Sequence, residues 1–128
     1  MFENLDVFRM SAAMARHAGH RQAVIAQNVA NADTPGYVAR DIPAFATSYA
    51  PDDSGAHQRA TRAGHMHGMV PGQAPPIMEM PGEGSPNGNQ VTVEEEIFKA
   101  VEAKRQHDRA IAIYKSALTV MRNAIRTQ

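Results

Sequence analysis

The chain has 128 residues, 43% of them hydrophobic, and its 13 basic and 13 acidic residues give a formal net charge of zero. A neutral chain has no overall attraction for nucleic acid or for an anionic membrane, so we expect no nucleic-acid partner. Cysteine is absent, which excludes disulfides, thiolate metal sites and a cysteine nucleophile.

The first residues do not have the pattern of a targeting segment. Glu3 and Asp6 stand where a secretory signal carries positive charge. No apolar run approaches the ~20 residues that are needed to cross a bilayer. We therefore expect neither a membrane span nor a cleaved signal peptide.

Residues 1–32 are predicted to form one long helix. Small and apolar residues recur at alternating spacings of three and four, which is the period of one helix face. Alanine and glycine dominate this face, so it can approach a partner helix closely but buries little apolar surface. The larger side chains expected to pack against that partner are Leu5, Phe8, Ile25 and Val29.

The middle of the chain has a different composition. Residues 33–49 are predicted to form a turn and then an extended segment. Between about residues 50 and 89 lie six of the eight prolines and seven of the nine glycines, and no apolar period survives there. Residues 50–90 are therefore predicted to be a flexible insertion.

Residues 91–128 are predicted to form a second long helix, beginning near Val93. The acidic run from Glu94 to Glu96 is interpreted as stabilising the helix start, where the helix dipole favours negative charge. The apolar face of this helix, which is expected to take part in helix packing, comprises Ile97, Val101, Ile111, Leu118, Met121 and Ile125.

Together these segments predict an all-α chain with long N- and C-terminal helices and an irregular Pro/Gly-rich middle segment. Ordering each residue costs on the order of 1 to 2 kcal/mol. Two alanine-rich helix faces bury too little surface to offset that cost comfortably. We therefore expect a helix pair that completes its packing against other subunits.

Two groups of residues could in principle bind a metal ion. The stretch from His65 to Met69, HMHGM, has the soft ligands that copper(I) prefers. A polar loop is the better interpretation, because nothing there would fix the ligand geometry. His17 and His20 lie three residues apart on the first helix. For them too a structural interpretation, a solvated helix face, is preferred over a metal site. No phosphate loop or nucleophile elbow is present, so we expect no enzyme, no cofactor, no metal and no small-molecule substrate.

The most specific pattern is the stretch NVANADTPGY, from Asn28 to Tyr37. Pro35 presets the first central position of a turn, and Gly36 can adopt the positive φ that a type II turn requires at the next position. Asn31 could end the helix in the left-handed conformation. Asn28 and Asn31 share a helix face, where buried amides need partners. On physical grounds alone this could be an ordinary helix end with no wider role.

The same residues resemble a known family. Residues 30–37 resemble the ANxxTPGY signature of the bacterial flagellar rod, hook and hook-associated proteins. The stretches GNQVTVEEE and IYKSALTVMRNAI are similar to the short proximal rod subunits of that family. The unbroken Thr-Pro-Gly-Tyr favours one type of these subunits over the FlgC-like type. By this resemblance the assembly motif comprises Asn28, Asn31, Thr34, Pro35, Gly36 and Tyr37.

The resemblance implies a structural subunit of the proximal rod of the flagellar basal body, in the periplasmic space. It implies terminal helices packed as an antiparallel coiled coil, and export of the unfolded chain by the flagellar type III apparatus. Phe45 and Tyr49 fit the pattern by which the export gate recognises such substrates. The implied partners are other copies of the chain, FlgC-like and FlgF-like rod subunits, the MS-ring protein, the FliE adaptor and the export gate.

The resulting hypothesis is a subunit that polymerises through its terminal helices, links the MS ring and export gate to the distal rod, and transmits torque. Two alternatives stay open at this point. One is a small cytoplasmic helical-hairpin binding module that responds to metal through His65 and His67. The other is a different short rod subunit of the FlgC-like type.

Overall fold

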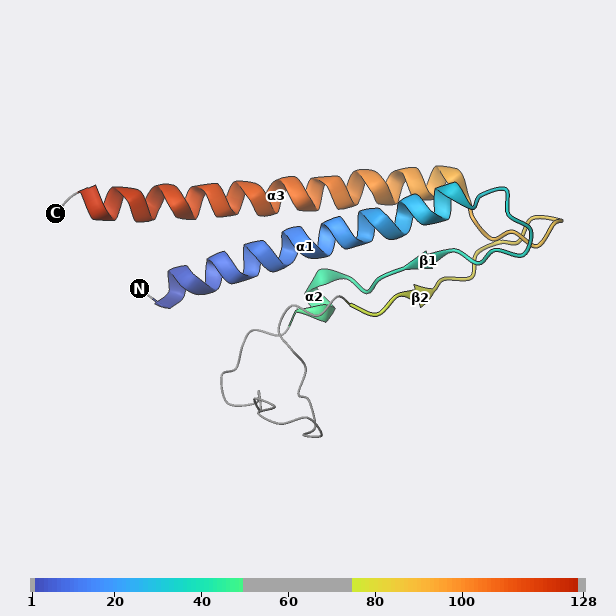
Figure 1. Ribbon diagram of the computed structural model, residues 1–128, viewed down its shortest axis with the longest axis horizontal. Helices are drawn as coiled ribbons and strands as arrows, with labels where there is room; N and C mark the ends of the chain where they lie inside the picture. Colours follow the sequence, from blue (N-terminus) through green and yellow to red (C-terminus); the bar gives the residue numbers. More distant parts are fainter. Residues whose placement is uncertain (1, 50–74, 127–128) are drawn as a thin grey trace, which may run out of the picture.

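The computed structural model describes residues 2–49 and 75–126. Two long helices, α1 (Phe2–Ala30) and α3 (Val93–Arg126), flank three short elements, β1 (Arg40–Asp41), α2 (Phe45–Ser48) and β2 (Met78–Glu79). The long helices lie side by side in opposite directions, so the start of α1 and the end of α3 lie at the same end of the molecule (Figure 1). The prediction of an all-α chain with an antiparallel pair of terminal helices is confirmed. None of the helices described here is long and apolar enough to span a membrane.

Alanine side chains form much of the contact between α1 and α3. Ala18 on α1 and Ala103 and Ala110 on α3 are at most 1% exposed. Small side chains at a helix contact allow the two backbones to approach closely. Nearer the end of the molecule where α1 begins and α3 ends, the rings of Phe8 and Tyr114 meet edge to face with their centroids 5.1 Å apart.

The predicted packing residues divide into two groups. Ile25 is buried, whereas Phe8, Ile111, Leu118 and Met121 are half-buried. The remaining described members are exposed in the single chain, so their helix packing stays a prediction: Val29 (42%), Ile97 (55%), Val101 (47%) and Ile125 (73%). The side chain of Leu5 lies outside the described part of the structure.

For Ile97 and Val101 the reason for the exposure is the orientation of α3. Glu96 is the residue that faces inward at the start of α3, with 1% of its surface exposed. Successive helix residues are rotated by about 100°, so Ile97 is turned away from this inward face. Val101, four residues further on, lies on the same outward side.

Strands β1 and β2 form a two-stranded arm that lies beside α1 (Figure 1). Strands β1 and β2 pair antiparallel, with Arg40 opposite Glu79 and Asp41 opposite Met78. The amide of Met80 donates to the carbonyl of Ala39 at 2.8 Å. The prediction of a flexible insertion over 50–90 is therefore wrong for residues 75–90, whereas 50–74, with the HMHGM stretch, lie outside the described residues.

The alanine contact between the helices gives a direct test. Ala110 is fully buried (0% exposed), so Ala110→Leu should overpack the helix contact and lower the free energy of unfolding by about 1 to 3 kcal/mol. Thermal unfolding followed by circular dichroism measures this. Ala112→Leu is the matched control, because Ala112 is exposed two residues away on the same helix. Equal unfolding midpoints for the two variants would contradict the described helix contact.

Candidate functional site

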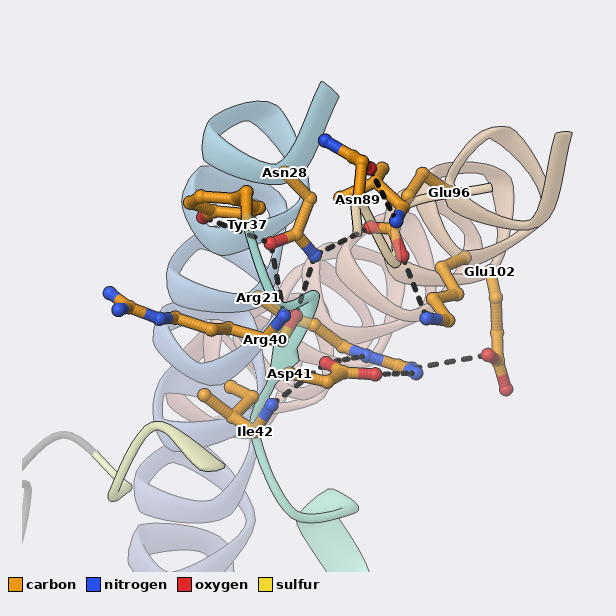
Figure 2. Close-up of polar contacts among 11 residues, drawn as sticks. Arg21, Asn28, Tyr37, Arg40, Asp41, Ile42, Asn89, Glu96 and Glu102 are labelled. Carbon is orange, nitrogen blue, oxygen red and sulfur yellow. Dashed lines mark hydrogen bonds and ion pairs between the residues drawn. The ribbon is translucent and has the colours of Figure 1, made fainter. Parts of the chain in front are cut away.

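The side chain of Asn28 lies at the junction of α1, the arm and α3. It is 0% exposed. Its Nδ2 donates to the carbonyl of Arg40 at 2.6 Å and to Oε2 of Glu96 at 2.9 Å, while its Oδ1 accepts from the amide of Arg40 at 3.0 Å. Figure 2 shows Asn28 between Arg40 on the arm and Glu96 on α3.

The bonds to Arg40 imitate strand pairing. A side-chain amide offers the same donor and acceptor as a peptide group, and Asn28 uses both on the backbone of one residue. Strand β1 is therefore paired on one edge by β2 and on the other by a side chain of α1. This attaches the arm to α1 without a third strand.

Glu96 extends the same network into α3. Its carboxylate accepts from Asn28 and, at 2.7 Å, from Nζ of Lys99. A buried carboxylate requires such donors, because leaving it unpaired would be costly. The sequence interpretation missed this role, because three consecutive glutamates conceal which one faces inward.

The chain leaves α1 through a sharp turn, as predicted. The amide of Tyr37 donates to the carbonyl of Thr34 at 3.3 Å, and Gly36, at the third turn position, has φ +72°. A positive φ at that position is what a type II turn requires. Asn31 does not adopt the left-handed conformation in which it could have ended the helix. It instead bonds the last helical turn, with Nδ2 donating to the carbonyl of Gln27 at 2.8 Å.

Asn89, which precedes α3 in the chain, also bonds this turn. It is 2% exposed. Its Nδ2 donates to the carbonyls of Asn31 at 2.9 Å and Thr34 at 2.7 Å, and its Oδ1 accepts from the amide of Val91 at 2.8 Å. These two carbonyls also accept from the amides of Thr34 and Tyr37, so Asn89 gives each of them a second donor. Sequence reasoning missed Asn89, since nothing distinguishes it from other polar residues in a Pro/Gly-rich stretch.

A second turn, residues 85–88, packs against the first. The amide of Gly36 donates to the carbonyl of Asn87 at 3.3 Å, and the amide of Gln90 donates to the carbonyl of Tyr37 at 2.9 Å. A Cβ at Gly88 would lie only 3.5 Å from Cα of Gly36. Residues 85–90 thus contact the predicted assembly motif at Gly36 and Tyr37.

The members of the predicted motif have different surroundings. Asn28 is buried, whereas Asn31 and Tyr37 are half-buried, and the hydroxyl of Tyr37 donates to Oδ1 of Asn28 at 3.4 Å. Thr34, Pro35 and Gly36 are exposed at the turn. The structure therefore unites an inward polar cluster with an outward turn.

An ion pair fixes the next part of the arm. The guanidinium of Arg21 donates two bonds of 3.0 Å to the carboxylate of Asp41 and one of 3.1 Å to Glu102 on α3. Burial alone would raise the pKa of Asp41, but hydrogen bonds from Arg21 and from the amide of Ile42 outweigh it and hold that pKa below its ordinary value. The hydrogen bond with Asp41 raises the pKa of Arg21. The pair is charged on both sides at neutral pH.

Phe45 and Tyr49, the residues of the predicted export-gate pattern, lie at α2. Their rings stack with centroids 5.0 Å apart. The ring of His17 meets Phe45 edge to face at 5.5 Å, and its Nε2 donates to the carbonyl of Pro43 at 2.8 Å. His17 therefore anchors the arm to α1. Within residues 2–49 and 75–126, no group of three His, Asp or Glu side chains is placed to hold a metal ion.

These features define a class of protein, in which paired terminal helices carry an arm that is held by asparagine side chains at a Thr-Pro-Gly-Tyr turn. A family model described as flagella basal body rod protein matches residues 8–37. The flagellar basal body rod protein FlgB of Agrobacterium fabrum is 27% identical over 116 residues, covering 88% of this chain and 87% of that protein. FlgB of Escherichia coli K12 is 29% identical over 143 aligned positions, covering 99% of each chain.

FlgB of Shigella flexneri matches to the same extent as the Escherichia coli protein. The stretch matched by the family model contains Asn28 and ends at Tyr37, so it coincides with α1 and the turn. The chain is therefore similar to flagellar basal body rod proteins, within residues 8–37 by the family model and over most of its length by the FlgB relatives.

The contact between Asn28 and Glu96 can be tested by paired substitutions. Asn28→Asp places a second buried carboxylate beside Glu96 and removes both donors, so it should lower the free energy of unfolding by about 3 kcal/mol or more. Adding Glu96→Gln supplies an amide donor to that new carboxylate and should restore part of the loss. Denaturant unfolding of the two single variants and the double variant measures the coupling. Strictly additive effects would show that the two side chains do not interact.

Acid titration tests the ion pair at Asp41. Because the folded-state pKa of Asp41 is lowered, its charge contributes stability above the ordinary value of 3.8, and this contribution is lost as pH falls through the lower folded-state pKa. Asp41→Asn should therefore be less stable than wild type at neutral pH, and the difference should shrink below about pH 3.8. Urea unfolding across this range measures it, with the exposed Asp33→Asn as control. A difference that does not change with pH would contradict the ion pair.

Proposed function

We propose that this chain is a proximal rod subunit that polymerises through its paired terminal helices. The similarity to flagellar basal body rod proteins supports a structural role in the rod. The proposal adds how the subunit assembles. It also adds what the subunit does there, which is to link the MS ring and export gate to the distal rod and to transmit torque.

One observation supports this assembly more than any other. Among the described residues, seven hydrophobic side chains are buried and four of these are alanines, whereas eleven large hydrophobic side chains are exposed. Burying apolar surface is the main favourable term in folding and in most protein association. A chain with this distribution obtains its missing burial from neighbouring subunits.

The first turns of α3 offer the clearest contact surface. Val93, Ile97 and Val101 follow each other at spacings of four and are 38%, 55% and 47% exposed. Residues four apart lie on one helix face, so they form a continuous apolar strip, which we call the α3 strip. An alanine-rich helix of a neighbouring copy is the partner proposed for it.

The site supports the mechanical part of the proposal. Polar bonds join α1, the arm and α3 at Asn28, and the ion pairs of Arg21 join the same three elements a few turns away. Polar contacts at these two positions along α1 resist sliding of one helix along the other. A subunit of this kind can pass a twisting force to its neighbours with little internal deformation.

The export part of the proposal follows from the small core. A helix pair with little buried apolar surface is easily unfolded, as passage through a type III export gate requires. Phe45 and Tyr49 are half-buried at α2, so the gate would recognise them in the unfolded chain. The other proposed partners are the MS-ring protein, the FliE adaptor and FlgC-like and FlgF-like rod subunits. The proposed location is the periplasmic part of the basal body.

The α3 strip gives the test of this proposal. Replacing Ile97 and Val101 together by glutamine should abolish swimming and rod assembly, because it removes apolar contact between subunits. The circular dichroism of the isolated variant should match wild type, since both side chains are exposed. Soft-agar motility and electron microscopy of basal bodies are the measurements.

The control replaces two exposed charged residues of the same helix, Arg105 and Arg109, by glutamine. This variant should assemble and swim normally. Normal swimming by the Ile97/Val101 variant would exclude the α3 strip as an assembly surface.

A further inference from the structure

We propose that Asn87 is a site of spontaneous deamidation, and that closure of the 85–88 turn on Gly36 controls its rate. The chain has six asparagines, and only Asn87 precedes a glycine. Glycine lacks a Cβ, so its backbone nitrogen is the least hindered for attack on the preceding side chain. Asn87 is also exposed, which gives water access to it. The proposal is independent of the rod role, because it concerns a reaction within one chain.

The reaction is balanced without any other reagent than water. The backbone nitrogen of Gly88 loses its proton and bonds to Cγ of Asn87, forming a five-membered succinimide, and Nδ2 leaves as ammonia. Water then opens the ring at one of its two carbonyls. The products are aspartate, or isoaspartate in which the backbone continues through the side-chain carboxyl carbon.

The folded turn restrains both reacting groups. The amide of Gly88 donates to the carbonyl of Ser85 at 2.8 Å, so the attacking nitrogen is held in a hydrogen bond. Oδ1 of Asn87 accepts from the amide of Asn89 at 3.0 Å, which fixes the orientation of the carboxamide. The turn must open before the nitrogen can approach Cγ. Deamidation therefore proceeds mainly in chains whose turn is open.

The isoaspartate product would break the contacts between the 85–88 turn and Gly36. It inserts one more carbon into the backbone between residues 87 and 88. The carbonyl of Asn87 accepts from the amide of Gly36 at 3.3 Å, and Gly88 lies against Gly36. A longer backbone cannot keep both contacts and the Ser85 to Gly88 closure. Chains that stay unfolded would thus lose the ability to close the 85–88 turn on Gly36, whereas chains that fold promptly would be protected.

The test compares deamidation rates in three samples at neutral pH. These are wild type in buffer, wild type in guanidinium chloride, and Asn28→Ala in buffer. Asn28→Ala removes the bonds to Arg40, Glu96 and Tyr37 and should loosen the site, while it leaves the sequence around Asn87 unchanged. Peptide mapping by mass spectrometry gives the rate at each asparagine, and isoaspartyl methyltransferase labels the isoaspartate. Wild type in buffer should react slower than in denaturant by on the order of tenfold or more, and Asn28→Ala should lie between them.

Equal wild-type rates in buffer and in denaturant would overturn control by the turn. Reaction at Asn89 or Asn31 as fast as at Asn87 in denaturant would overturn the choice of site. Asn87→Gln is the control for the chemistry, because glutamine would have to form a larger ring, and it should yield no labelled product. After incubation in denaturant and refolding, wild type should melt at lower temperature than Asn87→Gln. Asn87→Asp, which has the charge but the normal backbone, should melt like fresh wild type.

Discussion

The buried side-chain amide of Asn28 is the interaction on which the rest of this structure depends. One amide bonds the backbone of Arg40 twice and the carboxylate of Glu96 once, so it joins α1 to both other parts of the molecule. Glu96 is 1% exposed, so its carboxylate depends on the donors that Asn28 and Lys99 supply. Polar groups buried in this way are costly if left unpaired, which makes the arrangement specific as well as stable.

Specificity and stability have different sources in this chain. Asparagines and ion pairs define how α1, the arm and α3 meet, whereas the apolar core that normally supplies the favourable free energy is small and rich in alanine. Eleven of the larger apolar side chains among the described residues are exposed, including the three of the α3 strip. Such a subunit has a defined shape but too little buried surface to be very stable alone. In the proposed rod, neighbouring copies supply the burial that the single chain lacks.

The sequence predicted what local chemistry determines. The bounds of α3 and the positive φ of Gly36 follow from helix periodicity and turn geometry. It could not predict which of two apolar faces on α3 meets α1, because periodicity defines a face but not its partner. Residues 75–90 were mistaken for a flexible segment because their prolines and glycines form turns. Asn89 and Glu96 could not be identified as site residues, since only the three-dimensional contacts distinguish them from their neighbours.

A high-resolution reconstruction of the purified basal body tests the central claim most directly. The account predicts that this chain lies in the proximal rod, with Asn28 still bonded to Arg40 and Glu96 and with Val93, Ile97 and Val101 buried by a neighbouring subunit. Finding the chain there with those three side chains exposed to solvent, or with the arm detached from Asn28, would contradict it.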